Sequence, residues 1–257
     1  MDARFFESTV NFWFEDNLAE KVQFLNKFYQ CFLMNQLIHK TRKLVLNGVR
    51  DSGKTSFREV FKGLLNYDKI AMVTEEEKFG LSMIKEDTEL LYIDEWADKT
   101  LSASLAKILL QGGMFPQSVK FHNGQIQVMN GGIFITCNGL PDFGKDQENV
   151  ERRLAIFQTK ELPQLFPEAP EWMKNNAMSC LVWTINVINS NKHLIPKEEL
   201  FYELPADELS TLSRFQDRMD PVELQKIIDC EIVEQEELVE EAESSNDVFK
   251  IGDKRPG

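Results

Sequence analysis

The chain has 257 residues, of which 42% are apolar, and it carries a formal net charge of −13. This length and apolar fraction predict a globular protein with one large core, with or without a small appendage. No run of 18 apolar residues exists, and the N-terminus lacks the apolar block of a signal peptide, so we expect a soluble, intracellular protein with no membrane partner. The four cysteines stand far apart without a Cys-x-x-Cys pair, which predicts reduced thiols.

The negative charge is concentrated in the C-terminal part of the sequence. Residues 201–257 hold 16 acidic and 6 basic residues, whereas residues 1–200 hold 26 acidic and 23 basic residues, a balance of −3. A body so close to neutral can still grip an acidic polymer through a few local cations. The composition therefore does not exclude nucleic acid as a partner.

The first element in chain order is a predicted pair of helices. Apolar residues between positions 5 and 39 recur at intervals of three and four residues. We expect these helices to form a collar that packs against the next domain. A role of the collar in self-assembly would be an addition to that packing.

A phosphate-binding loop follows the collar. The apolar residues 44–46 lead directly into Gly-x-x-x-x-Gly-Lys-Thr, and apolar residues at helical spacing predict a helix over about residues 54–65. In such a loop the glycines let backbone N–H groups point at one anion, the lysine reaches the β- and γ-phosphates, and the threonine hydroxyl can ligate Mg²⁺. The motif predicts that five loop residues bind a nucleotide: Gly48, Ser52, Gly53, Lys54 and Thr55.

Another apolar strand ends in two carboxylates, 40 residues after the lysine of the phosphate loop. Residues 90–93 are apolar, and Asp94 and Glu95 follow them directly. Asp94 can hold the shell of a Mg²⁺ ion, and Glu95 can orient and deprotonate the water that attacks ATP. Because the phosphate loop precedes this pair, we interpret the two carboxylates as part of a site that hydrolyses ATP.

A predicted helix over residues 102–110 precedes a predicted β-hairpin. Two strand-like arms flank the Asn-Gly pair at positions 123–124, which is a strong signal for a short hairpin. The tip carries Lys120, Phe121 and His122. These three residues are candidates for contact with a nucleic acid.

Two further strands follow the hairpin. The apolar residues 132–137 end on Asn138, whose amide could polarise the γ-phosphate or the water, or could cap the strand end. Arg152 and Arg153 stand immediately before an apolar strand that begins at residue 154. Asn138 thus follows its strand, whereas the two arginines precede theirs.

The last part of the sequence combines a core helix with an acidic extension. We expect the helix over residues 173–189, whereas residues 231–243 are a charged run typical of a solvated helix or linker, and about the last 15 residues have a disordered composition. The expected parts are therefore the collar (1–40), an ATPase domain (41–192) and an acidic, partly disordered extension (193–257).

The order of these features resembles the superfamily 3 helicases of small DNA viruses, most of all the initiator proteins of parvoviruses and next the papillomavirus helicases. The resemblance covers roughly residues 25–188. Besides the phosphate loop, residues 106–113 resemble the family's helix before the hairpin. Residues 133–138 resemble its strand that ends in Thr-x-Asn, and residues 153–157 resemble its Arg-hydrophobic-x-x-Phe segment.

The resemblance implies an α/β fold, namely an AAA+-like P-loop ATPase. In that fold helices flank a central parallel sheet, a helical collar precedes it, and a β-hairpin is inserted before the sensor strand. It implies an ATP-dependent DNA helicase that acts in viral or mobile-element replication, with ATP and Mg²⁺ bound between the subunits of a ring, usually a hexamer. The hairpins would pull single-stranded DNA through the ring, and the host nucleus would be the location.

The resemblance also implies residue roles. Within one subunit it assigns ATP binding and hydrolysis to five residues: Lys54, Thr55, Asp94, Glu95 and Asn138. Arg153 would be the arginine finger that reaches the neighbour's γ-phosphate. Lys120 and His122 would contact DNA. Apart from the resemblance, Phe121 is a candidate stacking surface or packs against its own domain, and the acidic tail is a candidate contact for replication partner proteins.

The sequence departs from the family in three places. The tip reads Lys-Phe-His rather than two adjacent basic residues, and two glycines at 131–132 stand where the family often has proline. Parvovirus initiators carry a nicking endonuclease upstream, and this sequence has no His-x-His pair. We therefore expect either a helicase domain cut from a longer protein or an element that keeps its nuclease elsewhere.

Two alternative functions remain. A GTPase should show Asn-Lys-x-Asp, which residues 138–142 do not match, and a small-molecule kinase needs neither the hairpin nor a finger arginine. The other alternative is an ATP-gated assembly ring that binds nucleic acid or proteins without translocating. The intact Asp94–Glu95 pair favours hydrolysis over such a switch.

Overall fold

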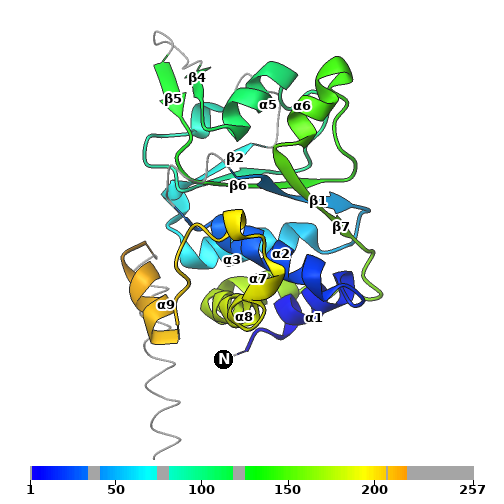
Figure 1. Ribbon diagram of the computed structural model, residues 1–257, viewed down its shortest axis with the longest axis vertical. Coiled ribbons are helices and arrows are strands. Elements are labelled where there is room, and N and C mark those ends of the chain that lie inside the picture. The colour runs from blue at the N-terminus through cyan, green and yellow to red at the C-terminus, as the bar shows by residue number, and fades with distance from the viewer. Residues whose placement is uncertain (1, 34–40, 74–80, 118–124, 207, 219–257) are drawn as a thin grey trace, which may run out of the picture.

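Five parallel strands form the central sheet of the computed structural model, which describes residues 2–33, 41–73, 81–117, 125–206 and 208–218. Their order across the sheet is β2-β3-β6-β1-β7 (Figure 1). The strands are β1 (Lys43–Gly48), β2 (Ile70–Val73), β3 (Leu90–Ile93), β6 (Gly132–Cys137) and β7 (Leu154–Thr159). Helices cover both faces, so the predicted α/β P-loop fold with a central parallel sheet is confirmed.

The two faces of the sheet belong to two separate hydrophobic cores. Successive side chains of a strand point to opposite faces, so Leu44 and Leu46 lie in one core while Val45 lies in the other. The same alternation places Tyr92 and Ile93 in different cores. Because both faces are covered, the strands are mainly apolar, as is usual for parallel sheets, and β2 and β3 consist almost entirely of apolar residues.

The larger layer lies below the sheet in Figure 1 and contains the N-terminal helices. Its members are α1 (Arg4–Trp13), α2 (Leu18–Gln30), α3 (Phe57–Leu64), α7 (Ala169–Asn175) and α8 (Ala177–Ser190). Aromatic rings fill it: Phe61 lies 4.6 Å from Phe32 and 4.9 Å from Phe28, measured between ring centroids. The two helices predicted at the N-terminus are therefore present and share one core with the sheet.

Two expectations for the helices need correction. The helix after the phosphate loop begins as a 3-10 turn, η2 (Lys54–Ser56), before α3 continues it. The single helix predicted over residues 173–189 is two helices, because the chain leaves helical geometry at Asn176, whose φ is −113° and ψ 29°. The carbonyl oxygen of Trp172 accepts from both the backbone N–H of Asn176, at 3.0 Å, and its side-chain amide, at 2.9 Å.

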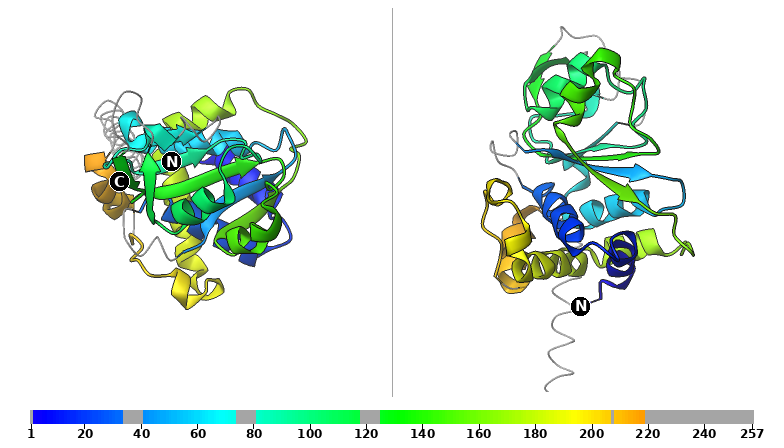
Figure 2. Two further views of the ribbon diagram at one scale, coloured as in Figure 1. Left: turned by 90° about the horizontal axis from the view of Figure 1, so that it is seen from above. Right: turned by 45° about the vertical axis from the view of Figure 1, so that its right-hand side comes forward.

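The smaller layer lies above the sheet and carries the hairpin (Figures 1 and 2). It contains α5 (Ala103–Leu110), α6 (Gln147–Glu151) and the antiparallel strands β4 (Met114–Gln117) and β5 (Gln125–Val128). The first arm lies earlier than predicted: Gln125 pairs with Gln117, whereas a two-residue Asn-Gly turn would pair it with His122. Burial of Phe115 in the upper core anchors the arm in this register.

The described chain ends beside the lower layer. Short 3-10 turns connect the larger elements: η3 (Tyr67–Lys69), η4 (Leu81–Met83), η5 (Gly144–Asp146), η6 (Lys192–Leu194), η7 (Lys197–Glu199) and η8 (Gln216–Arg218). An ion pair between Lys27 and Glu199 fastens η7 to α2, and α9 (Glu208–Phe215) follows.

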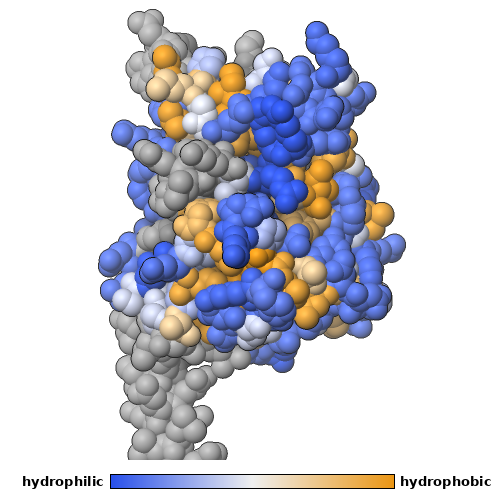
Figure 3. All heavy atoms as spheres, in the orientation of Figure 1, coloured by the Kyte–Doolittle hydropathy of each residue, from blue (hydrophilic) through white to orange (hydrophobic). Residues whose placement is uncertain are grey.

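On the face drawn in Figure 3, hydrophobic residues gather over the helix layer, interrupted by hydrophilic ones. None of the helices in the described ranges is long and apolar enough to span a membrane.

Candidate functional site

Three strands end side by side at one edge of the sheet. Strand β6 lies between β1 and β3, with Cys137 opposite Asn47 and Ile135 opposite Ile93. The loops that follow these strands therefore meet at their carboxyl ends, where ligands bind in open α/β sheets. Most of the residues that the sequence singles out for ATP lie here: the phosphate loop after β1, Asp94 and Glu95 after β3, and Asn138 after β6.

The two glycines of the phosphate loop are required by its geometry. A Cβ atom on Gly48 would lie 2.3 Å from Oγ1 of Thr159 and 2.5 Å from its carbonyl oxygen. Gly53 has a φ of +81°, in the left-handed region that disfavours side chains. The loop therefore keeps its curvature only with glycine at both positions.

Neighbouring elements hold the loop in place through Ser52. The indole Nε1–H of Trp13, in α1, donates to the carbonyl oxygen of Ser52 at 3.0 Å. The hydroxyl of Thr159, at the end of β7, donates to Oγ of Ser52 at 2.9 Å. Ser52 is 1% exposed, so these hydrogen bonds lie away from water. The N-terminal helix and the last strand thus position the loop together.

Lys54 lies at the centre of the loop with its ammonium group buried. Its Nζ donates to the carbonyl oxygens of Gly48 at 2.8 Å and Val49 at 2.6 Å. It also donates to Oδ1 of Asn138 at 3.2 Å, which joins two candidate residues 84 positions apart. Burial lowers the pKa of Lys54 below its usual value, and the negative charge of Glu95 partly opposes this shift.

The loop borders a polar pocket of about 310 Å³. Its lining residues come from the loop and from the ends of β3 and β6, together with one residue of the segment after β7: Arg50, Asp51, Ser52, Gly53, Lys54, Thr55, Ser56, Glu95, Thr136, Cys137, Asn138 and Leu165. A second pocket of about 360 Å³ has mainly apolar walls from α1 and residues 162–169, and it shares Gly53, Ser56 and Leu165 with the first. A polar and an apolar pocket therefore adjoin at the start of η2.

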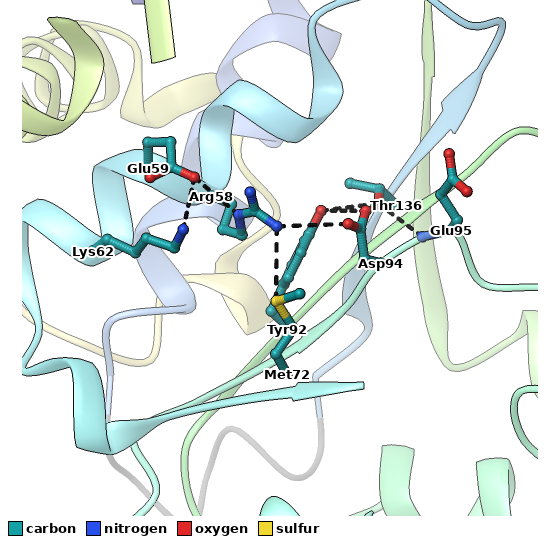
Figure 4. A network of polar contacts seen from close by, with 8 residues as sticks. All are labelled: Arg58, Glu59, Lys62, Met72, Tyr92, Asp94, Glu95 and Thr136. Atoms are coloured by element: carbon teal, nitrogen blue, oxygen red, sulfur yellow. Dashed lines mark hydrogen bonds and ion pairs between the residues drawn. The ribbon is translucent and has the colours of Figure 1, made fainter. Parts of the chain in front are cut away.

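Asp94 and Glu95 point in different directions (Figure 4). Oδ1 of Asp94 accepts from the Tyr92 hydroxyl at 2.6 Å and from the Thr136 hydroxyl at 3.0 Å. Its Oδ2 lies 3.6 Å from Nη1 of Arg58. Glu95 instead lines the polar pocket, with a left-handed φ of 49° and its backbone N–H donating to the Thr136 hydroxyl at 3.3 Å. Burial, and then the hydrogen bond to Asp94, raise the pKa of Tyr92.

The sequence assigns a Mg²⁺ ion to Thr55 and Asp94; Thr55 lines the polar pocket, whereas Asp94 is not among its lining residues. Among the described residues no group of three or more histidine, cysteine or acidic side chains could hold a metal ion. Mg²⁺ is usually held by one or two carboxylates, waters and substrate phosphates, so no such group is needed. The Asp94 carboxylate already faces a cation, the guanidinium of Arg58, and Thr55 lines the neighbouring pocket.

Arg153 lies at the amino-terminal end of β7, away from the strand ends that form the site. It precedes β7, whose first residue pairs with Lys43 and whose last pairs with Gly48, and its carbonyl oxygen accepts from the N–H of Lys43 at 2.8 Å. Six residues of strand separate it from the level of the phosphate loop, which is about 20 Å. Arg153 therefore cannot reach the pocket of its own chain.

The three hairpin candidates, Lys120, Phe121 and His122, lie outside the described residues. Other residues of the site had no role in the sequence analysis. Tyr92 and Thr136 could have been found, because Tyr92 stands two positions before Asp94 and Thr136 two before Asn138, on the same strand faces. Trp13 and Arg58 carry no comparable signal, since only the tertiary structure brings them to the site.

Comparison with known proteins supports the fold. No family model and no curated protein matches the sequence. An apo structure of the C-terminal region of NrS-1 matches with a TM-score of 0.50 at 11% identity, over 84% of this chain and 51% of that one. A second NrS-1 structure gives 0.49 at 12%, over 69% and 44%, and a JCV helicase bound to an acetamide compound gives 0.36 at 15%, over 84% and 61%. The chain spans about half the length of the NrS-1 chains. At 11% identity, the match with a TM-score of 0.50 establishes a shared fold alone.

Replacing Trp13 by phenylalanine tests how the loop is held. Trp13→Phe removes the donor to the buried Ser52 carbonyl, so we expect a loss of about 1–3 kcal/mol in the free energy of unfolding from the unpaired oxygen. Trp96→Phe is the matched control, because Trp96 is buried and its Nε1 has no partner among the described residues. Urea unfolding of both variants measures the difference. An equal loss in the two would contradict the role of the Trp13 hydrogen bond.

Proposed function

We propose that the polar pocket binds ATP and hydrolyses it. The observation that carries this proposal is the meeting of Lys54 and Asn138, 3.2 Å apart, in one pocket with Thr55 and Glu95. These residues come from three separate strand ends, so their convergence is a property of the fold. Besides Asn138, the oxygen atoms that Lys54 now binds belong to the loop itself, and phosphate oxygens would replace them as stronger, charged acceptors.

The adjoining apolar pocket would take the base of the nucleotide. It begins at Gly53 and Ser56, where the phosphate loop turns into η2, and Phe5 and Phe12 of α1 contribute to its walls. Small-molecule sites are typically apolar with a few polar groups at one end, and the two pockets together have that form. The N-terminal helix would therefore contribute to the nucleotide site, beyond its packing in the core.

The residues supply the parts needed for hydrolysis. A Mg²⁺ ion held by Thr55, Asp94 and the phosphates would neutralise the charge that develops on the phosphate oxygens. Glu95 would accept a proton from the water whose oxygen attacks the γ-phosphorus, while the bond to the β–γ bridging oxygen breaks. Lys54 would hold the β- and γ-phosphates, and Asn138 would orient the γ-phosphate or the water.

The position of Arg153 supports hydrolysis between subunits of a ring. It lies about 20 Å from its own phosphate loop along β7, so a finger role requires a second copy of the chain. We propose a homo-oligomeric ring, with a hexamer as the expected form, in which Arg153 reaches the γ-phosphate held by a neighbour. Arg152, which is exposed beside it, is the second candidate for this role.

We further propose that the ring is a superfamily 3 DNA helicase that translocates on single-stranded DNA during viral or mobile-element replication in the host nucleus. The hairpin of β4 and β5 stands on the face of the sheet that carries α5 and α6, away from the larger helix layer (Figure 2). It could line a central channel there, with Lys120, Phe121 and His122 between its strands. The acidic C-terminal extension would remain available for replication partner proteins.

Variants of Lys54 and Glu95 should separate binding from turnover. Lys54→Ala should abolish hydrolysis, because the phosphates lose their cation, whereas Glu95→Gln should bind ATP normally and lose turnover. The exposed Lys99, outside both pockets, gives a control variant, Lys99→Ala, that should keep full activity. Nucleotide binding and phosphate release measure the two steps. Normal turnover in Glu95→Gln would show that Glu95 does not activate the water.

Mixed rings test the role of Arg153 in trans. Arg153→Ala alone should lower turnover by about 10³-fold or more, as loss of an arginine finger does. Mixing Arg153→Ala subunits with Lys54→Ala subunits should restore part of the activity, because some interfaces then combine an intact loop with an intact finger. Steady-state hydrolysis of the mixture measures the rescue. Absence of rescue, with both variants assembled in rings, would argue against a finger acting between subunits.

A further inference from the structure

Arg58, on the helix that follows the phosphate loop, is held by four neighbours (Figure 4). Its Nε lies 3.0 Å from Oε1 of Glu59, and its Nη1 lies 3.6 Å from Oδ2 of Asp94 and 3.7 Å from the sulfur of Met72. Its guanidinium also lies 5.4 Å from the ring centroid of Tyr92, within the range of a cation–π contact. The Arg58 side chain is 19% exposed, so these contacts are partly shielded from solvent.

The two carboxylate oxygens of Asp94 have different partners. Oδ1 accepts the hydrogen bonds of Tyr92 and Thr136, which fix the carboxylate in place. Oδ2 faces the guanidinium of Arg58. A carboxylate oxygen that carries a metal ion must offer it negative charge, and the ion pair with the guanidinium, at 3.6 Å, already offsets part of that charge. Arg58 and a divalent cation therefore compete for Oδ2 of Asp94.

We propose that Arg58 is a positioning residue that acts as a built-in counter-ion of Asp94 and yields this carboxylate when a divalent cation enters with the nucleotide. The inference rests on the proposed ATP site and adds a residue to it. Arg58 lies three positions after Thr55, and residues at this spacing are neighbours on a helix surface, so the exchange would occur beside the predicted Mg²⁺ ligands.

Glu59 makes the exchange feasible. Its Oε1 binds both Arg58, at 3.0 Å, and Lys62, at 2.9 Å. When Asp94 turns to the metal ion, Arg58 keeps the carboxylate of Glu59 and is not left as an unpaired, partly buried charge. The two acids thus have distinct roles: Glu59 retains the guanidinium, and Asp94 shares it with the metal ion.

The test compares the metal dependence of nucleotide binding in matched variants of the full chain. Binding of a non-hydrolysable ATP analogue is measured by calorimetry in EDTA and then across a Mg²⁺ titration. Arg58→Gln should lower the Mg²⁺ concentration that gives half of the gain in affinity by about tenfold, a shift typical of removing one close, partly shielded charge. Arg58→Lys, which keeps the charge without the planar fork, should lie between Arg58→Gln and the parent chain.

Lys62→Gln is the matched control. It removes a positive charge from the same Glu59 carboxylate without touching Asp94, so its Mg²⁺ dependence should stay within about twofold of the parent chain. An equal shift in Lys62→Gln and Arg58→Gln would overturn the inference, because the effect would then be general electrostatics. A higher Mg²⁺ requirement in Arg58→Gln would also overturn it, since Arg58 would then prepare Asp94 for the metal ion.

The same titration separates this inference from the proposed function. If the parent chain binds the analogue and Arg58→Gln leaves the Mg²⁺ dependence unchanged, the ATP site stands and the role of Arg58 is wrong. If the parent chain binds no analogue with or without Mg²⁺, the proposed function fails and the inference fails with it. Should Arg58→Gln not fold, Arg58→Lys still decides the question, because a shift toward lower Mg²⁺ is required of it as well.

Discussion

The parallel pairing of β6 between β1 and β3 is the constraint on which the candidate site depends. It brings the phosphate loop, the Asp94–Glu95 pair and Asn138 to one edge of the sheet, although these residues are spread over 91 positions of the chain, from 48 to 138. The two apolar cores stabilise this pairing by covering both faces of the sheet. The chemistry proposed for the site is therefore a consequence of strand order, and a shift in the register of β6 would separate Asn138 from Lys54.

The site combines buried, fixed groups with groups that are free to exchange partners. Ser52, Tyr92 and Thr136 are buried and hydrogen-bonded, which fixes the phosphate loop and one oxygen of Asp94. Phosphate oxygens would instead compete with the acceptors that Lys54 now binds, and a metal ion would compete with Arg58 for the Asp94 carboxylate. Arg153 lies at the end of the sheet that is away from the phosphate loop, so one chain alone cannot place its positive charge at the site. The proposed activity therefore requires a second copy of the chain.

Much of this arrangement could be predicted from the sequence, because short motifs and apolar periodicity report local structure. The strands that end at Gly48, Ile93 and Cys137 lie where the apolar runs place them. The sequence predicts the first strand of the hairpin too close to the Asn-Gly pair. The Asn-Gly signal is local, whereas the register depends on the burial of Phe115 in the tertiary structure. No role could be assigned to Arg58 from the sequence. Its partner Asp94 lies 36 positions away, and the two residues come together only when α3 packs against the sheet.

The proposed ring would couple ATP hydrolysis to movement along single-stranded DNA. This coupling is tested most directly by measuring strand displacement from a partial duplex and ATP hydrolysis in the same reaction, with and without single-stranded DNA. A translocating ring should hydrolyse ATP faster in the presence of DNA and should displace a strand only when both ATP and Mg²⁺ are present. Hydrolysis that DNA leaves unchanged, with no strand displaced by the assembled protein, would contradict this coupling and favour an ATP-gated assembly ring.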